Sequence, residues 1–270
     1  MKLQEIFDQL EYGELSQLSI GGLPAGVIDE SNWPRLVAHI NLGMIALYKR
    51  FTLKQGRITL ALVSGQTRYR LHSDYSVHSL RVPLETKYIM DSVTARFADD
   101  IQKVERITGD HRLGMINGVA ATIGAQDRYL HERAEFGLND LSDEFAIFTP
   151  SRDVIEVPRA IVNHGWDLPE RWQTDNLEIF YRADAPKIVI PIGYFDPDRV
   201  EVPVPASHLE PLLYFVAGRI HNPVGMGDEF NAGNTYAAKF EAACQQLESA
   251  GLQVNQDSQG SNRLARNGWV

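Results

Sequence analysis

Two apolar stripes with helical spacing, one toward each end of the chain, constrain the fold more than any other feature. Near the N-terminus the stripe consists of Leu36, Ile40, Met44, Leu47 and Phe51. Near the C-terminus it follows i, i+3, i+4, i+7, i+8 and i+11, over Leu209, Leu212, Leu213, Val216, Ala217 and Ile220. Each pattern places its apolar residues on one face of a helix, so each helix must bury that face against another element.

Shorter or less regular patterns predict a helix beside each stripe. A helix ahead of Gly13 has one apolar face made of Leu3, Ile6, Phe7 and Leu10. The first long helix covers residues 31 to 51, with Asp29 or Ser31 as its cap. A last helix from Asp228 to Ala250, ended by Gly251, is predicted to turn inward Phe230, Ala237, Phe240, Cys244 and Leu247.

Between the helices the sequence changes to short β-branched or alternating runs punctuated by glycine and proline. Residues 57–63 and 67–71 flank Ser64-Gly65 and predict one hairpin, and residues 145–149 and 154–157 predict a second. Single strands are predicted for residues 177–181, 187–190 and 200–204. Residues 97–108 fit either a strand with a bulge or a short helix.

Together these patterns predict an α+β protein in which the N- and C-terminal helices form a helical bundle with a β-rich insertion. The discontinuous helical core is predicted to comprise residues 1–56 and 203–252, and the insertion residues 57–202. Residues 253–270 are rich in Gln, Asn, Ser and Gly, and we expect an extended C-terminal tail there.

Composition narrows the classes of function. The 270 residues are 44% hydrophobic and carry a formal net charge of −9. An acidic chain argues against a nucleic-acid binder that neutralises phosphates, but it suits a surface past which DNA slides. Residues 114–125 are too few and too glycine-rich to span a bilayer, so no membrane partner is expected. The single Cys244 cannot form an internal disulfide, and we expect synthesis in the cytoplasm.

Strong local motifs for catalysis or cofactor binding are missing from the sequence, which contains no GxSxG, GxxxxGK[ST], HExxH or CxxC. The weaker candidates each have a structural interpretation that we favour. His72 and His78 could share a metal, but separate imidazoles are the simpler explanation. Adjacent acids such as Asp99 and Asp100 point in different directions on a helix or a strand, so they do not form a catalytic pair.

Three further candidates receive the same interpretation. Asp196-Pro197-Asp198 is typical of a proline turn with two exposed acids rather than of a metal loop. The glycines at 114, 118 and 124 do not have dinucleotide-loop spacing and suit a mobile loop. Cys244 lies on an apolar helix face, where a free cysteine acts as a small hydrophobe. The sequence therefore predicts no enzyme activity, no cofactor and no metal.

Several segments, taken in order, resemble tailed-phage head-to-tail adaptor proteins, also called neck or connector proteins. Toward the N-terminus the resemblance covers Ile40-Asn41-Leu42-Gly43, the run Leu47 to Phe51, and Gly56. In the remainder it covers Leu138-Asn139-Asp140, Phe148-Thr149-Pro150-Ser151, Val154 to Pro158, Leu177 to Ala183, Val202 to Pro205, Leu212 to Arg219, and the last helix with Tyr236, Phe240, Glu241, Cys244 and Leu247 through Gly251-Leu252. Residues 72–137 fall outside the resemblance.

The resemblance implies a virion structural protein in the neck or tail. It implies a homo-oligomeric ring, usually a dodecamer, between the portal protein and the tail nozzle or tube, with double-stranded DNA passing through the centre. Such a ring would line the DNA channel, retain the packaged DNA and take part in its ejection. The family offers no catalytic motif to transfer.

Two other classes of function compete with this one. One is another tail or baseplate component, which co-purification with fibres rather than with a portal would identify. The other is a soluble enzyme whose site lies in the β-rich middle, which a deep pocket lined by several histidines would favour. Partner binding is predicted for the tail, where Arg and Trp are residue types that anchor interfaces. The residues expected to meet the portal or a neighbouring subunit are Arg263, Leu264, Arg266 and Trp269.

Overall fold

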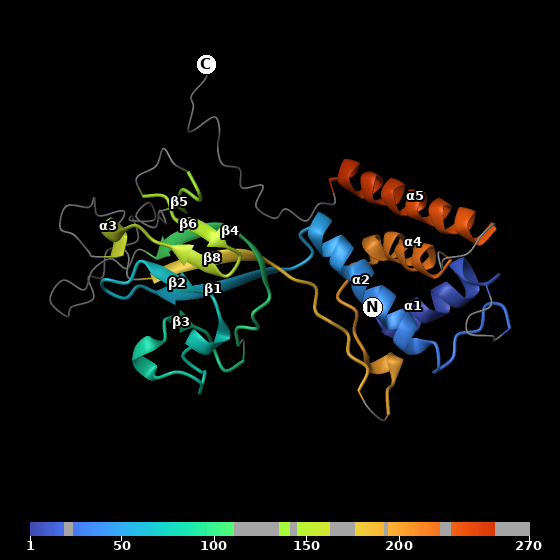
Figure 1. Cartoon of the computed structure of the whole chain (residues 1–270), viewed down its shortest axis with the longest axis horizontal. Coiled ribbons are helices and arrows are strands. Elements are labelled where there is room, and N and C mark those ends of the chain that lie inside the picture. The colour runs from blue at the N-terminus through green and yellow to red at the C-terminus, as the bar shows by residue number, and fades with distance from the viewer. Residues whose placement is uncertain are drawn as a thin grey trace, which may run out of the picture. The chain divides into compact units, whose positions relative to one another are not determined.

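The structure, a computed structural model, describes residues 1–18, 24–94, 96–110, 135–140, 145–162, 176–191, 194–221 and 228–251. Contacts divide the chain into two compact units. The helical unit contains residues 1–54 and 184–270, and the β unit contains the single stretch 55–183. The long helices therefore lie in one unit of an α+β protein and the described strands lie in the other (Figure 1).

Helices from both ends of the chain build the helical unit. Its elements are α1 (Leu3–Gln9), the π-helical turn η1 (Leu10–Glu14), α2 (Trp33–Arg50), the 3-10 turns η5 (Pro197–Arg199) and η6 (Ala206–His208), α4 (Leu209–Ile220) and α5 (Asp228–Ser249). The helices predicted from the apolar stripes are confirmed, and Gly251 ends the last one with a φ of +70°.

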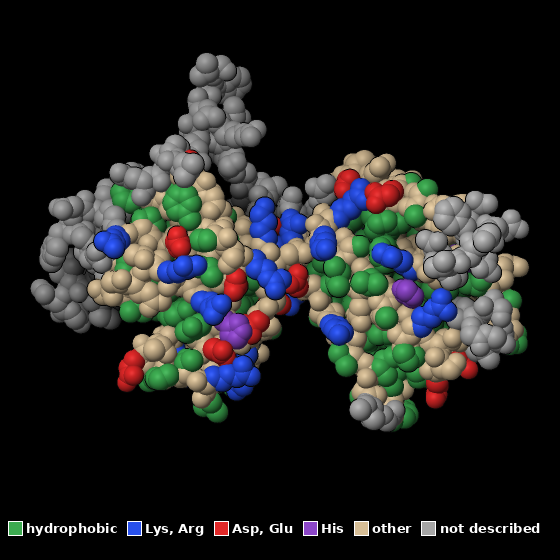
Figure 2. Space-filling model, viewed as in Figure 1, with side chains coloured by type: hydrophobic (Ala, Val, Ile, Leu, Met, Phe, Trp, Pro, Cys, Tyr) green, Lys and Arg blue, Asp and Glu red, His purple; other side chains and the backbone are tan. Residues whose placement is uncertain are grey.

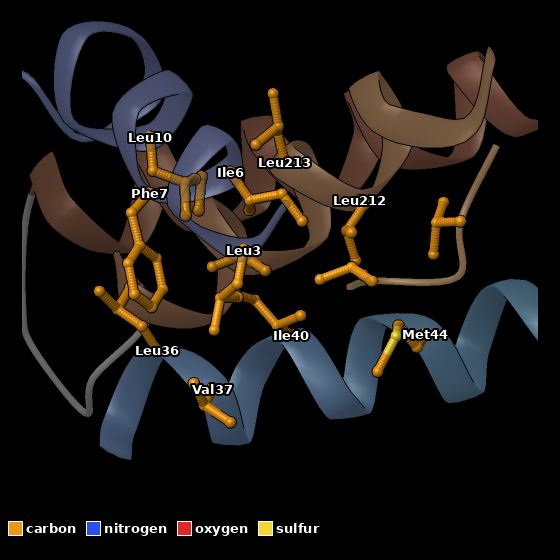
Figure 3. Packing of buried hydrophobic residues seen from close by; sticks show 14 of the residues in the cluster. Leu3, Ile6, Phe7, Leu10, Leu36, Val37, Ile40, Met44, Leu212 and Leu213 are labelled. Atoms are coloured by element: carbon orange, nitrogen blue, oxygen red, sulfur yellow. The ribbon is translucent and has the colours of Figure 1, made fainter. Parts of the chain in front are cut away.

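One hydrophobic core joins these helices. Figure 3 shows side chains of α1, α2 and α4 pointing toward one another, with Leu3 and Ile6 beside Ile40 and Leu212. All five residues of the N-terminal stripe are fully buried, as the spacing predicts. On α5, Cys244 is buried but Ala237 is exposed, so the prediction that Ala237 faces inward was wrong, because α5 turns Tyr236 and Gly233 toward α4 instead.

Extended segments following the β unit also belong to this core. Ile188, Val202 and Val204 are buried with the helices, and Asn41 on α2 bonds both backbone groups of Ile188 at 2.9 Å. Residues 184–202, which were predicted to belong to the insertion, therefore lie in the helical unit. Gln55 and Gly56, which were predicted to belong to the helical core, lie in β1 (Gln55–Ala61) of the β unit. The strands predicted at 187–190 and 200–204 are wrong, because these segments bond to helices and not to a sheet, apart from one isolated bridge between Lys2 and Glu201.

Two antiparallel sheets make up the β unit. The five-stranded sheet has the order β3-β1-β8-β4-β5, and the three-stranded sheet has the order β2-β7-β6. The strands are β1 (Gln55–Ala61), β2 (Arg68–Arg70), β3 (Ile89–Met90), β4 (Ile101–Asp110), β5 (Glu135–Phe136), β6 (Phe148–Ser151), β7 (Val154–Glu156) and β8 (Asn176–Ala183). Short helices are η2 (Ser73–Tyr75), η3 (Leu84–Thr86) and α3 (Arg159–Val162), and one core is shared by both sheets.

The first predicted hairpin was wrong and the second is confirmed. β1 pairs along its whole length with β8, and β2 pairs with β7 in the other sheet. The turn at Gly65, with a φ of +79°, does form, but the Tyr69 hydroxyl bonds the backbone of Val63 and closes the end of β1 there. β6 and β7 pair as predicted, and residues 101–110 form a strand with two register shifts, which settles the strand-or-helix alternative.

Candidate functional site: interaction surfaces

The histidines singled out by the sequence do not converge on a metal. His72 places Nδ1 3.2 Å from the Asp74 carboxylate and Nε2 3.8 Å from that of Asp99, while His78 Nδ1 lies 2.8 Å from Asp91. Among the residues that the structure describes, no three His, Cys, Asp or Glu side chains are grouped so that they could hold a metal ion. The two imidazoles therefore serve separate local contacts.

The adjacent acids Asp99 and Asp100 lie at a bend of the chain and contact different partners. Asp99, with a φ of +57°, accepts hydrogen bonds from the backbone N–H and the hydroxyl of Ser73. Asp100 accepts a hydrogen bond of 2.9 Å from the hydroxyl of Tyr181. Burial, and then this bond to Asp100, raise the pKa of Tyr181 well above its usual value, so the phenol stays protonated as a donor. Both carboxylates hold the fold together.

The remaining chemical candidates are structural as well. Asp196 closes the η5 turn by accepting from the backbone N–H of Asp198, and it also pairs with Arg199 at 3.1 Å. Burial raises the pKa of the Cys244 thiol to about 11, which keeps it protonated and unreactive at neutral pH. The glycines at 114, 118 and 124 lie outside the described residues.

A groove of about 510 Å³ opens beside β2 and does not have the lining that an enzyme site of histidines would need. Arg68 and Arg70 point into it from the same face of β2, each near an acid of the β7 hairpin, Glu156 at 3.6 Å and Asp153 at 3.9 Å. The lining residues are Gln66, Arg68, Arg70, Tyr75, Glu85, Thr86, Tyr88 and Val154. Burial raises the pKa of Tyr88 to about 12, so this phenol also remains a neutral donor.

The face of the five-stranded sheet opposite its core carries ordered charges. The strand register aligns Arg57, Phe180 and Arg106 in one row across β1, β8 and β4. Both guanidinium groups lie over the Phe180 ring, at 5.9 Å and 4.3 Å from its centroid. Arg57 also pairs with the buried carboxylate of Glu178 at 2.5 Å. These contacts use the arginines within the sheet, which leaves little free charge for a ligand.

A loop of the β unit presents apolar side chains to solvent. We call residues 76–94 the arm; it is the teal segment around η3 and β3 in Figure 1. The exposed large apolar residues of the arm are Leu80 (100% exposed), Leu84 (72%), Met90 (50%) and Val93 (69%). The arm is nonetheless ordered, because His78 bonds Asp91 and Lys87 Nζ donates to the carbonyl oxygens of Val77 and Ser79.

A second exposed apolar surface lies on the helical unit. On α2, Ala38, Leu42, Ile45 and Lys49 share the face opposite the core stripe, and all four are exposed. Val189 is 66% exposed and lies beside α2, because the neighbouring Ile188 is bonded to Asn41. We call Ala38, Leu42, Ile45 and Val189 the α2 patch. Figure 2 shows hydrophobic side chains over α2 between basic ones.

Sequence reasoning missed both surfaces, for different reasons. Leu42 and Ile45 are visible in the sequence as apolar residues off the buried stripe of their helix. Leu80 and Leu84 lie in a segment without periodicity and gave no signal. The predicted partner-binding residues Arg263, Leu264, Arg266 and Trp269 fall outside the described residues. Among the described helices, none is long and apolar enough to cross a membrane.

Comparison with known proteins found one matching protein family. A protein-family model described as SU10 adaptor protein matches residues 11–266, which is nearly the whole chain and includes both units. A search of curated proteins found no match. The matched range runs through the segment 72–137, which the resemblance in the sequence did not cover.

Proposed function

Because the chain belongs to the SU10 adaptor protein family, a family of phage head-to-tail adaptors, we propose that it assembles into a ring between the portal and the tail. The family is structural and places the chain in the neck of the virion, where it meets portal and tail components. In this proposal the ring is a dodecamer, and the chain contributes its surfaces and carries out no reaction.

The single observation that carries the proposal is the family match over residues 11–266. Two features of the structure are consistent with it. Each unit has its own hydrophobic core, so each is a folded body able to present a surface. Each also exposes apolar side chains, the arm on one and the α2 patch on the other, and such exposure is typical of protein–protein contact.

The proposed ring surrounds double-stranded DNA without holding it. A net charge of −9 supports this, because a negative wall repels phosphates and forms no counterion-releasing contacts. We expect the isolated protein to bind duplex DNA no more tightly than about 10⁻⁴ M at physiological salt, the weak end of non-specific binding. Fluorescence anisotropy with a labelled duplex measures this, and tight binding with a steep salt dependence contradicts it.

Docking to the portal is proposed for the tail, residues 253–270. Its composition is polar, yet it ends in Arg263, Leu264, Arg266 and Trp269. A polar segment with an aromatic anchor and two arginines orders itself only when a partner supplies apolar and acidic surface. A chain ending at Leu252 keeps every described residue, so it should fold normally and lose affinity for the portal ring.

The deciding experiment mixes the purified full chain with the portal ring of the same phage and images the product by electron microscopy. The proposal expects a second ring stacked coaxially on the portal. The chain ending at Leu252 is the matched comparison for the role of the tail. Association with tail fibres or baseplate and not with the portal would assign the protein to a lower part of the tail and contradict the proposal.

A further inference from the structure

The arm and the α2 patch are different surfaces of one chain, and both expose apolar side chains that the described structure leaves uncovered. A closed ring with one kind of subunit needs such a pair, because a heterologous contact joins two different patches. Burying leucine, isoleucine and valine side chains that are now exposed is favourable by about 25 cal/mol per Å² of apolar area. Contact between the two surfaces is therefore favourable, because each covers the exposed apolar side chains of the other.

Charges beside the two surfaces are complementary. Glu85 follows Leu84 on the arm, is exposed, and has no ion pair among the described residues. Lys49 extends the exposed face of α2, and Lys187 precedes Ile188 on the segment that carries Val189; both are exposed and form no ion pair with any described residue. By contrast, Arg81 on the arm is already paired with Asp74 at 3.2 Å. Lys87, the other cation of the arm, is half-buried and donates to the carbonyl oxygens of Val77 and Ser79. The exposed charge without an ion pair is thus negative beside Leu84 and positive at the α2 patch.

From this geometry we propose that the arm of one copy docks on the α2 patch of the next copy, with Leu80 and Leu84 against Leu42, Ile45 and Val189, and Glu85 near Lys49 and Lys187. This inference rests on the proposed ring. It assigns the occupant of both surfaces to a second copy of this chain. The order of the arm suits this role, since a loop already held by Lys87 and by the His78–Asp91 bond loses little entropy on docking.

The first test places a charge in each surface of the full-length chain. Leu84→Asp in the arm and Leu42→Asp in the α2 patch should each raise the protein concentration needed for assembly by at least about tenfold, equivalent to about 1.4 kcal/mol. Assembly is followed by sedimentation velocity and native mass spectrometry, in solution and on the portal ring. Tyr12→Asp is the matched control, because Tyr12 is 82% exposed and lies in neither surface.

A mixture of the two variants tests the heterologous geometry directly. Leu84→Asp chains keep an intact α2 patch and Leu42→Asp chains keep an intact arm, so each mixed pair retains one good contact. The mixture should form heterodimers and no larger species at concentrations where the unsubstituted chain forms rings. Recovery of full rings from the mixture, or no association beyond that of either variant alone, would overturn the proposed pairing.

Charge reversal gives a test that does not depend on lost apolar contact. Glu85→Lys should weaken assembly, and adding Lys49→Glu with Lys187→Glu in the same chain should restore most of it. Unchanged assembly in all arm variants, with rings still formed on the portal, overturns the inference and leaves the adaptor function standing. An unsubstituted chain that assembles neither alone nor with the portal overturns both. Loss of portal binding alone would assign the arm to the portal and also contradict the inference.

Discussion

The two units of this protein each have a hydrophobic core, but they differ in how far apart in sequence their parts lie. The helical unit joins residues from both ends of the chain in one core, and its helices α2 and α4 lie more than 150 residues apart in sequence. The β unit is one continuous stretch, and its turns and loops are held by side-chain hydrogen bonds such as those of Asp91, Asp99 and Tyr88. The difference indicates that the β unit can fold as soon as it is synthesised, whereas α1 and α2 must wait for α4.

Replacing Leu213 by Asp is expected to have the largest effect and to act on the helical unit alone. Leu213 is 9% exposed in the core of α4, so the variant buries an unpaired charge and should cost about 3–5 kcal/mol of unfolding free energy. Hydrogen exchange with mass spectrometry resolves the two units, and peptides of β1 and β8 should keep their protection. Ala238→Asp on the exposed face of α5 is the control and should change stability by less than about 0.5 kcal/mol. Equal loss of protection in both units would contradict separate stability.

The next largest effect is expected in the β unit, from Gly56→Ala. A Cβ at residue 56 would overlap the ring of Tyr181 on the paired strand β8, and overpacking of this kind costs about 1–3 kcal/mol. Thermal unfolding and hydrogen exchange of the β8 peptides measure the loss. Gly13→Ala in the helical unit is the control, since its added Cβ meets no atom within 4 Å beyond its own turn of the chain. If Gly56→Ala remains destabilising when Tyr181 is replaced by Leu, the ring is not the obstacle.

Acid should separate the two units by the pH at which each loses stability. Burial lowers the pKa of His208 below 6.5, and burial together with Arg35 and Arg219 lowers that of His39. The unfolded chain therefore binds more protons than the folded one below about pH 6.5, so the helical unit loses stability as pH falls from 7 to 5. The limit is about 1.4 kcal/mol per pH unit for each histidine.

The β unit should respond at lower pH. Burial raises the pKa of Asp91, but hydrogen bonds from Ser76, His78 and Phe97 outweigh this, and the net pKa lies below 3.8. The hydrogen bond from Ser151 similarly lowers the pKa of Asp153. Stability from these acids is present above pH 3.8 and is lost below it.

Unfolding by denaturant at pH 7, 6 and 5 tests the difference in pH response between the two units. His208→Gln should reduce the dependence of the helical unit's unfolding free energy on pH. An unchanged dependence would exclude His208 as its source.

The sequence predicts the helical unit better than it predicts the β unit. The local spacing of Leu36, Ile40 and Leu213 predicts that they are buried. The helices could therefore be predicted without knowing which elements they pack against. Strand pairing depends on residues that are distant in sequence. Gly56 pairs with Tyr181, which lies 125 positions away, and no local pattern in the sequence links the two residues. The exposed arm was unpredictable because solvent-exposed loops have no period, and the tail residues lie beyond the described chain.

The smallest expected effect concerns the ion pairs that join α2 to α5. The Arg50 guanidinium contacts Glu241 at 2.6 Å and Glu248 at 2.5 Å, and these bonds raise the pKa of Arg50 and lower that of Glu248. The three side chains are partly exposed, so water and salt weaken the attraction, and Arg50→Gln should cost only about 0.5–1 kcal/mol at low ionic strength.

A double-mutant cycle with Glu248→Gln measures the coupling free energy between Arg50 and Glu248. This coupling free energy should be smaller in 1 M salt, where the Debye length is about 3 Å, than at low ionic strength. Arg50→Lys should recover little of it, because an ammonium cannot contact two carboxylates with a planar fork. Glu201→Gln is the control, since its pair with Lys2 is longer, 3.5 Å, and more exposed. A coupling that 1 M salt leaves unchanged would contradict the prediction, because it would mean that solvent does not screen these partly exposed charges.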